Sequence, residues 1–290
     1  MNQLSPGRFK PFPGISEQVY SRTDFEELRQ IVYEVAGIVM PPEKATLIYS
    51  RIAPLVRESG QQTFGRYIDL IRVDKSELRK TINALTTNHT FFYRERHHFD
   101  HLAASVRSDL LAKAASGQPV RIWSAGCSTG EELYSLTMTL LGPDRSEARA
   151  FLQGDVVILA TDLADHAVAG ASAGTYDFDS LKDVPTELIR AWTTHKNGTV
   201  NMADDMRKLI RVRRLNLLGE WPMRRPFDVI FCRNVMIYFD NPTKERLVSR
   251  FVDQLLPGGH LYIGHSERVS GPAEREVDLV GGTIYRKYSS

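Results

Sequence analysis

The segment that most constrains the fold of this chain is residues 120–141, which predict a β-strand, a glycine turn and an α-helix in direct succession. A short apolar run predicts the strand, and Gly126 and Gly130 allow a tight turn and the close approach of a ligand to the backbone. An amphipathic helix is predicted by leucines at helical spacing, Leu133, Leu136, Leu140 and Leu141. This order is the first half of a nucleotide-binding α/β unit, although an ordinary strand–turn–helix connection shows the same pattern.

The turn is acidic where the helix begins. Glu131 and Glu132 follow the second glycine directly, and they would repel the pyrophosphate of a dinucleotide. The spacing Gly-x-x-x-Gly also lacks the third glycine or the lysine of the usual phosphate-binding turns. An acidic turn suits a ligand that carries positive charge, such as the sulfonium and ammonium groups of S-adenosylmethionine.

Two further apolar runs, residues 155–162 and 226–234, predict buried strands that end in polar residues. In an open α/β sheet the ligand lies off the carboxyl ends of the strands, so we expect Gly126, Asp162 and Asn234 there. A carboxylate can accept two hydrogen bonds from a ribose diol, and Asp162 is the candidate for this contact. The alternative is that Asp162 caps the following helix. Residues 283–288 predict a last, antiparallel strand at the edge of the sheet.

The N-terminal third predicts a separate helical domain. Residues 1–20 hold several prolines and glycines without a period and predict a mobile tail. The first helix is expected to begin near Thr23, with a capping box to Glu26. Further helices are predicted at residues 43–58, 63–73 and 75–85. The expected organisation is a tail at 1–20, a helical domain with its linker at 21–94 and an α/β domain at 95–290.

Residues 176–214 interrupt the alternation of strands and helices and predict a small inserted β-subdomain. Antiparallel strands are expected between residues 202 and 216, because Ile210 and Val212 alternate there with Arg211 and Arg213. Alternation alone explains the exposure of these arginines, and a docking surface for an acidic partner is the alternative.

Composition and residue usage exclude several classes of protein. A formal net charge of +2 argues against bulk nucleic acid as the partner, and no apolar run approaches the roughly 18 residues of a membrane span. The only cysteines, Cys127 and Cys232, favour a reducing, cytoplasmic location. His97 and His101 share a helix face, but no third ligand is evident, so we expect no metal.

Six motifs in this order carry a resemblance to a known family. They are Asn-His-Thr-Phe-Phe-Tyr-Arg-Glu (88–95), Trp-Ser-Ala-Gly-Cys-Ser-Thr-Gly-Glu-Glu (123–132), Ala-Thr-Asp (160–162), Gly-x-Tyr (174–176), Cys-Arg-Asn-Val-Met-Ile-Tyr-Phe (232–239) and Gly-His-Ser-Glu (264–267). From residue 24 to residue 288 the chain resembles the CheR-type chemoreceptor glutamate O-methyltransferases. Each motif alone is weak, whereas the ordered set is specific.

The resemblance implies a Rossmann-like methyltransferase domain with an N-terminal all-helical domain and a small inserted antiparallel β-subdomain. It implies S-adenosylmethionine as methyl donor, S-adenosylhomocysteine as product and receptor glutamates as acceptors. The cofactor contacts it implies are Asn88, Thr90, Arg94, Glu131, Asp162, Asn216, Leu217, Arg233 and Asn234. Arg94 and Tyr238 are implied beside the transferred methyl group, as catalytic residues.

The implied partner is the cytoplasmic helical region of methyl-accepting chemoreceptors. The turn at residues 194–198 is shorter than in family members that bind a receptor C-terminal pentapeptide, so we expect recognition without that peptide. Two other functions compete with this interpretation: a nucleic-acid methyltransferase of similar fold, which the low net charge disfavours, and a binding module that uses the cofactor pocket as a sensor.

Overall fold

The computed structural model describes residues 15–289, and residues 1–14 of the expected mobile tail lie outside the described part. The chain forms two compact units. One comprises the chain as far as Thr87 together with Tyr238–Asp240, and the other comprises Asn88–Ile237 with the chain from Asn241 onward. The boundary therefore falls at residue 87, not at residue 94. The reason is that Tyr93 donates its backbone N–H to Ser135 and packs its ring on Phe99, both of which belong to the larger unit.

The described residues of the smaller unit form four α-helices, α1 (Arg22–Ala36), α2 (Ala45–Glu58), α3 (Phe64–Val73) and α4 (Lys75–Leu85). A short 3₁₀ turn, η1 (Pro42–Lys44), precedes α2. The predicted cap of α1 is wrong by two residues: Ser21 and Asp24 form the capping box, because Ser21 has the extended backbone that an N-cap needs. Phe25, Leu28 and Ile52 are among the buried side chains of the unit's core.

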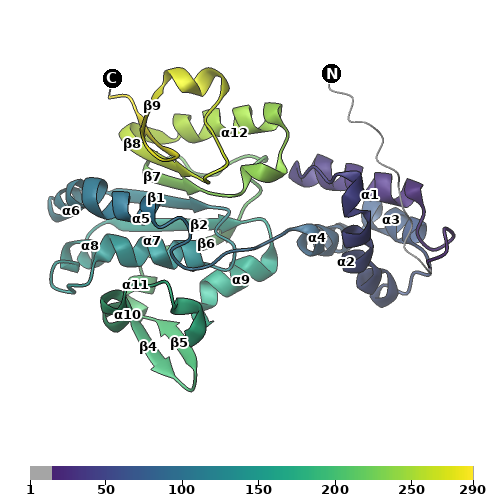
Figure 1. The fold of residues 1–290 in the computed structure, drawn as a ribbon, viewed down its shortest axis with the longest axis horizontal. Helices are drawn as coiled ribbons and strands as arrows, with labels where there is room; N and C mark the ends of the chain where they lie inside the picture. Colours follow the sequence, from purple (N-terminus) through teal and green to yellow (C-terminus); the bar gives the residue numbers. More distant parts are fainter. Residues whose placement is uncertain (1–14, 290) are drawn as a thin grey trace. The chain divides into compact units, whose positions relative to one another are not determined.

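The larger unit contains a seven-stranded sheet in the order β6-β2-β1-β7-β8-β10-β9 (Figure 1). Its strands are β1 (Val120–Ala125), β2 (Val156–Asp162), β6 (Ile210–Arg214), β7 (Phe227–Cys232), β8 (Leu255–Ile263), β9 (Val277–Gly281) and β10 (Ile284–Lys287). The strands β6, β2, β1, β7 and β8 pair with one another in parallel. The strand β10 is antiparallel to both β8 and β9. The strand order reverses between β1 and β7, which is the position where open α/β sheets bind ligands. The expected fold class is confirmed.

Two expectations about the sheet are wrong. The last strand, β10, lies inside the sheet, and β9 forms the edge. The strand β6 pairs in parallel with β2, so it belongs to the main sheet and not to the inserted subdomain. Alternation misled the prediction, because an edge strand of a parallel sheet is also half exposed.

Helices lie on both sides of this sheet, with α12 (Asn241–Asp253) on one side and α7 (Glu131–Leu141) and α8 (Arg149–Gln153) on the other (Figure 1). The segment before β1 forms α5 (His97–His101), a π-helical turn η2 (Leu102–Val106) and α6 (Arg107–Ala115). After β2 comes α9 (Asp165–Ala173). The sequence analysis predicted that α7 is amphipathic, with one exposed face. This is wrong, because every residue of α7 after Glu131 is buried. It is covered by the sheet and by other helices, including η2 and α10 (Thr186–Trp192).

The inserted subdomain is a three-stranded antiparallel sheet in the order β3-β5-β4. Its strands are β3 (Thr175–Asp177), β4 (Thr193–Lys196) and β5 (Thr199–Met202). Asn197 and Gly198 alone connect β4 to β5, and both have positive φ, as a two-residue hairpin turn requires. The larger unit also contains the short helix α11 (Asp204–Arg207). Its short 3₁₀ segments are η3 (Phe178–Leu181), η5 (Gly271–Arg275) and the start of η4 at Met236. Across the described chain, no helix is long and apolar enough to cross a membrane.

Candidate active site

The glycine turn lies at the carboxyl ends of β1 and β2. Gly126 and Cys127 donate their backbone N–H groups to the carbonyl of Thr161, at 2.8 and 2.9 Å, and so bind the turn to β2. Both turn glycines have positive φ and closely packed surroundings. A Cβ at Gly126 would lie 2.4 Å from Val235 Cγ2, and one at Gly130 would lie 2.5 Å from the Tyr176 hydroxyl. Side chains larger than hydrogen therefore do not fit at either position.

Asp162 is buried at the end of β2 and connects the turn to the β2–α9 loop. Its Oδ2 accepts the Ser128 N–H at 2.9 Å and its Oδ1 accepts the Ala164 N–H at 2.9 Å. The helix α9 has Ala164 as its N-cap residue, so Asp162 is not its cap. Burial raises the pKa of Asp162, and the two backbone N–H groups oppose that rise. Each carboxylate oxygen can accept one more hydrogen bond.

Three other predicted residues lie around Asp162. The carbonyl of Asn88 accepts the Ser128 hydroxyl at 3.3 Å, and Asn88 Oδ1 lies 3.1 Å from His166 Nε2. Leu215 donates its N–H to the carbonyl of Asp162 at 2.9 Å, which brings Asn216 and Leu217 to the same region. Leu217 is buried, and its carbonyl accepts Arg250 Nη1 at 2.7 Å. The ends of β2 and β6 and the segment that begins at Asn88 thus converge.

Glu131 and Arg94 are half-buried, and each side chain forms one hydrogen bond to the described protein. Glu131 is the first residue of α7, and its Oε2 accepts the Thr129 hydroxyl at 2.7 Å. Arg94 Nη1 donates to the carbonyl of His89 at 2.9 Å, and its guanidinium lies 5.7 Å from the centre of the Phe91 ring. Thr90 is half-buried in the same loop. Both charged groups therefore keep capacity for a ligand.

Arg233 is at the centre of a buried ionic network just after β7. Its side chain is almost completely buried, with Nη1 3.3 Å from Glu132 Oε2 and Nη2 3.3 Å from Glu95 Oε2. Nη2 also donates to the carbonyl of Arg94. Ser124 donates its hydroxyl to Glu132 Oε1 at 2.7 Å. The network connects β1, α7, the end of β7 and the loop that carries Arg94.

The two carboxylates of this network respond differently to their surroundings. Burial raises the pKa of Glu132 more than Arg233 and Ser124 lower it. Burial also opposes ionisation of Glu95, but the hydrogen bond from His265 and the charge of Arg233 lower the pKa of Glu95 to about 2. Glu95 Oε1 lies 2.8 Å from His265 Nδ1 and accepts Asn234 Nδ2 at 3.2 Å. Glu95 therefore stays ionised and holds Asn234 in place.

A third buried acid, Glu267, fixes the loop after β7. Its carboxylate accepts the backbone N–H groups of Gly264 at 2.6 Å, Asn234 at 3.1 Å and Ile237 at 3.2 Å. The sequence interpretation missed the roles of Glu95, Glu132 and Glu267, although all three lie inside the quoted motifs. The sequence did contain a signal, since each acid stands close to an apolar run that is expected to be buried. An acid that is buried needs a hydrogen-bond or ionic partner, so a structural role could have been predicted.

Tyr238 and the two histidines that were considered as metal ligands have the following contacts. Tyr238 clusters with the helical unit, and its carbonyl accepts the Val39 N–H at 2.8 Å. His97 and His101 form separate hydrogen bonds, His97 Nε2 with the Gly282 carbonyl at 3.0 Å and His101 Nδ1 with the Tyr262 hydroxyl at 2.9 Å. Within residues 15–289 no group of three potential metal ligands is found.

The parallel sheet with its reversal of strand order, the glycine turn and the acid at the end of β2 define a Rossmann-like α/β domain with a ligand site at the ends of its strands. Residues 88–286 match the model of the CheR methyltransferase SAM-binding domain, and residues 23–86 match that of the CheR methyltransferase all-alpha domain. The chain therefore belongs to the CheR methyltransferase family.

Chemotaxis protein methyltransferases of other bacteria match along most of this chain. A probable chemotaxis protein methyltransferase of Rhizobium etli is 42% identical over 262 residues, which is 88% of this chain and 96% of that protein. Chemotaxis protein methyltransferase 2 of Pseudomonas aeruginosa is 38% identical over 280 residues, 95% of this chain and 96% of that protein. The chemotaxis protein methyltransferase of Escherichia coli is 37% identical over 272 residues, 91% of each.

The cofactor is S-adenosylmethionine, and the chemistry of the residues fits it. Asp162 offers acceptor capacity for a ribose diol, and Glu131 places a second carboxylate beside the turn. Negative charge on both sides of a glycine turn suits a ligand with sulfonium and ammonium groups.

We predict that Glu132→Ala lowers the free energy of unfolding by about 3 kcal/mol, because it leaves Arg233 buried with one carboxylate fewer. The matched control is Glu131→Ala, which removes a half-buried acid from the helix N-terminus and should cost less than about 1 kcal/mol. Urea denaturation of both variants measures this. Equal losses would show that the Arg233–Glu132 pair contributes nothing specific.

We also predict that His98 makes the free energy of unfolding sensitive to acid. Its side chain is fully buried, and burial lowers the pKa of His98 from 6.5 to about 3. Between these values the unfolded chain binds a proton that the folded chain excludes. Stability is therefore complete above pH 6.5 and falls as the pH decreases, by at most about 1.4 kcal/mol per pH unit.

The measurement is urea denaturation at pH 7.5 and pH 5 for the wild type and for His98→Gln. The loss between the two pH values should be smaller in the variant, whose side chain does not titrate. The pKa of His260 is also lowered by burial, to about 4, so the comparison with the wild type isolates His98. The same loss in both proteins would contradict the prediction.

Proposed function

We propose that this protein transfers a methyl group from S-adenosylmethionine to glutamate side chains of chemoreceptors and so forms glutamate methyl esters for chemotactic adaptation. The observation that carries the proposal is the match to chemotaxis protein methyltransferases along most of both chains. The buried cysteines and the absence of a spanning helix in the described residues are compatible with work in the cytoplasm.

The chemistry requires positioning more than proton transfer. A glutamate carboxylate is already an anion near pH 7, so it needs no general base. S-adenosylmethionine supplies a methyl group activated by its sulfonium. The chain's task is to hold the acceptor in line and to exclude water, and such positioning lowers a barrier by several kcal/mol. We therefore propose a direct transfer without a covalent intermediate or a metal.

We propose Arg94 as the residue that binds the acceptor carboxylate. Its Nη1 is fixed by His89, and no bond of Nε or Nη2 to the described residues is found, so a guanidinium fork remains for a carboxylate. Tyr238 is a second proposed catalytic residue, supported only by the sequence resemblance.

The other residues are proposed either to contact the cofactor or to position the residues that do. Asp162 would accept the ribose hydroxyls, Glu131 would lie near the cationic end of the cofactor, and Asn216 and Leu217 would flank the adenine. Asn88, Thr90 and Asn234 would complete the pocket. Arg233 is proposed as a positioning residue, because its buried side chain is engaged with Glu95, Glu132 and the Arg94 carbonyl.

The test is methyl transfer from S-adenosylmethionine labelled in its methyl group to membranes that carry candidate chemoreceptors. Glutamate esters release labelled methanol in alkali, whereas methylated nucleic acids do not. Alkali-labile label on the receptor band supports the proposal. Label that appears only in added RNA, or no transfer in a single turnover with bound cofactor, would refute it.

For the cofactor site we predict that Asp162→Ala weakens binding of S-adenosylmethionine by about 1–3 kcal/mol, the scale of hydrogen bonds to a charged group. Asp179→Ala is the matched control, because Asp179 is an exposed acid of the inserted subdomain. Calorimetric titration measures both affinities. Unchanged affinity in a folded Asp162 variant would remove this residue from the site.

For the acceptor site we predict that Arg94→Ala lowers the turnover rate roughly 10–100-fold and lowers cofactor affinity much less. The reason is that charge-assisted bonds to the acceptor contribute mainly during transfer. Arg96→Ala is the control, because Arg96 is exposed and pairs only loosely with Asp100, at 3.6 Å. Equal losses of rate and affinity would make Arg94 an ordinary cofactor ligand.

We further propose that the enzyme recognises the helical region of the receptor directly. Arg51 and Arg57 lie on α2, but Arg51 Nη1 donates to the carbonyls at the end of α4, including that of Thr86 at 2.9 Å. Arg57 is exposed and is the better candidate for an acidic helix bundle. Contacts of this kind are weakened by salt.

The last prediction is that a receptor C-terminal pentapeptide does not bind the inserted subdomain. The hairpin turn is as short as two residues, and β4 offers an edge of only four residues to an added strand. Titration of the free peptide into the full-length protein tests this. Micromolar binding that is lost on replacing β4 residue Thr194 by proline, which removes a backbone donor, would contradict it.

A further inference from the structure

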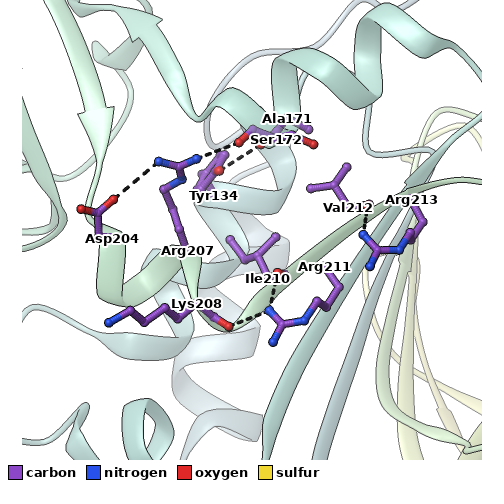
Figure 2. A pocket seen from close by; sticks show the side chains of 10 residues that line it. All are labelled: Tyr134, Ala171, Ser172, Asp204, Arg207, Lys208, Ile210, Arg211, Val212 and Arg213. Carbon is purple, nitrogen blue, oxygen red and sulfur yellow. Dashed lines mark hydrogen bonds and ion pairs between the residues drawn. The ribbon is translucent and has the colours of Figure 1, made fainter.

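A basic hollow of about 580 Å³ lies beside the edge strand β6 (Figure 2). Its lining comes from α7, the end of α9, α11 and β6, and consists of Tyr134, Ala171, Ser172, Asp204, Arg207, Lys208, Ile210, Arg211, Val212 and Arg213. None of these residues belongs to the proposed cofactor or acceptor site. The volume is in the range of small-molecule sites, which is roughly 300–1,000 Å³.

The charge of the hollow is strongly one-sided. Among the lining side chains, Arg207, Lys208, Arg211 and Arg213 are cationic, and Asp204 alone is a carboxylate. Asp204 is 92% exposed and lies 3.6 Å from Arg207 Nη1, so it screens little of that charge. Across residues 15–289, Lys208, Arg211 and Arg213 form no ion pair with any acid, and their charges are uncompensated within the described protein.

The floor of the hollow is fixed by hydrogen bonds. The hydroxyl of the buried Tyr134 donates to the Ala171 carbonyl at 2.9 Å, and Arg207 Nη2 donates to the Ser172 carbonyl at 2.9 Å. A cavity with a rigid floor orders a ligand at a lower entropic cost than a flat, mobile surface does.

Protection of a sheet edge explains part of this arrangement. Arg211 Nη1 donates to the Ile210 carbonyl at 2.8 Å and to the Lys208 carbonyl at 2.7 Å, and Arg213 Nη1 donates to the Val212 carbonyl at 2.7 Å. Charged side chains on an edge strand commonly prevent pairing with other chains. Edge protection uses only one nitrogen of each guanidinium group, however. It also requires neither a concave surface nor the two further cations, Arg207 of α11 and Lys208 directly after it.

We propose that this hollow binds a small, multiply charged phosphate anion. Arg211 and Arg213 are two residues apart on β6, so their side chains leave the strand on the same side, and both line the hollow. In each, Nε and Nη2 remain available as a planar pair of donors, which matches two phosphate oxygens. Arg207 and Lys208 add charge at the other end of the hollow. The site takes either an inorganic polyphosphate or the phosphate chain of a nucleotide, and it is independent of the proposed function.

The experiment is calorimetric titration of inorganic tripolyphosphate and, separately, ATP into the full-length protein saturated with S-adenosylhomocysteine. The cofactor product keeps the adenosine pocket from binding ATP. We expect saturable binding to one site, and at least tenfold weaker binding in Arg211→Gln/Arg213→Gln, since two charge-assisted contacts are lost. Tighter binding of ATP than of tripolyphosphate identifies a nucleotide site, and the reverse identifies a polyphosphate site.

The matched control is Arg190→Gln/Arg275→Gln, which removes two exposed charges outside the hollow and should leave the affinity unchanged. Unaltered affinity for S-adenosylhomocysteine shows that each variant is folded, and Lys208→Gln serves as a second variant. The proposal is overturned if neither anion gives saturable binding, if the hollow variants bind as well as the wild type, or if only a polyglutamate peptide or RNA binds.

Discussion

The buried guanidinium of Arg233 is the group on which the rest of the active site depends. A charge removed from water requires close partners, and Arg233 has Glu95, Glu132 and the Arg94 carbonyl. These partners come from separate stretches of the chain, so satisfying one charge fixes the distance between the loop at residues 88–95, the start of α7 and the end of β7. The packing of Arg233 over the Phe99 ring, at 5.3 Å, closes the arrangement from the side of α5.

The same network accounts for the strained backbone around the site. Six non-glycine residues of the described chain have positive φ, and four of them, Tyr93, Glu95, Ser128 and Asn234, lie in the loops that Arg233 and Asp162 hold. Such conformations persist only where the surroundings determine them more than once. Glu95 meets that condition through Arg233, Asn234 and His265, and Ser128 meets it through Asp162 and Asn88. Arg94 lies between two of these residues, Tyr93 and Glu95, so the contacts that hold its neighbours also position its backbone.

The sequence predicted the parts of the fold that depend on local pattern. The strands at β1, β2 and β7, the four N-terminal helices and the position of Asp162 followed from apolar runs, caps and the general rule for open α/β sheets. It did not predict the direction of β6, because alternation does not distinguish an antiparallel strand from a parallel edge strand. It also did not predict the partners of Glu132, since Arg233 lies 101 residues further along the chain and only the β1–β7 pairing brings them together.

The strand β6 adjoins both the candidate cofactor site and the cationic hollow. Its end leads to Asn216 and Leu217, and Arg214 lies in register with Asp162, which belongs to the proposed cofactor site. Its beginning carries Arg211 and the cationic hollow. One strand therefore adjoins two proposed sites, one for a cofactor with sulfonium and ammonium groups and one for a phosphate anion. The hydrogen bonds that tie the last residues of β6 to Asp162 belong to the same ladder as those beside the hollow, so the pairing of β6 with β2 positions the residues of both proposed sites.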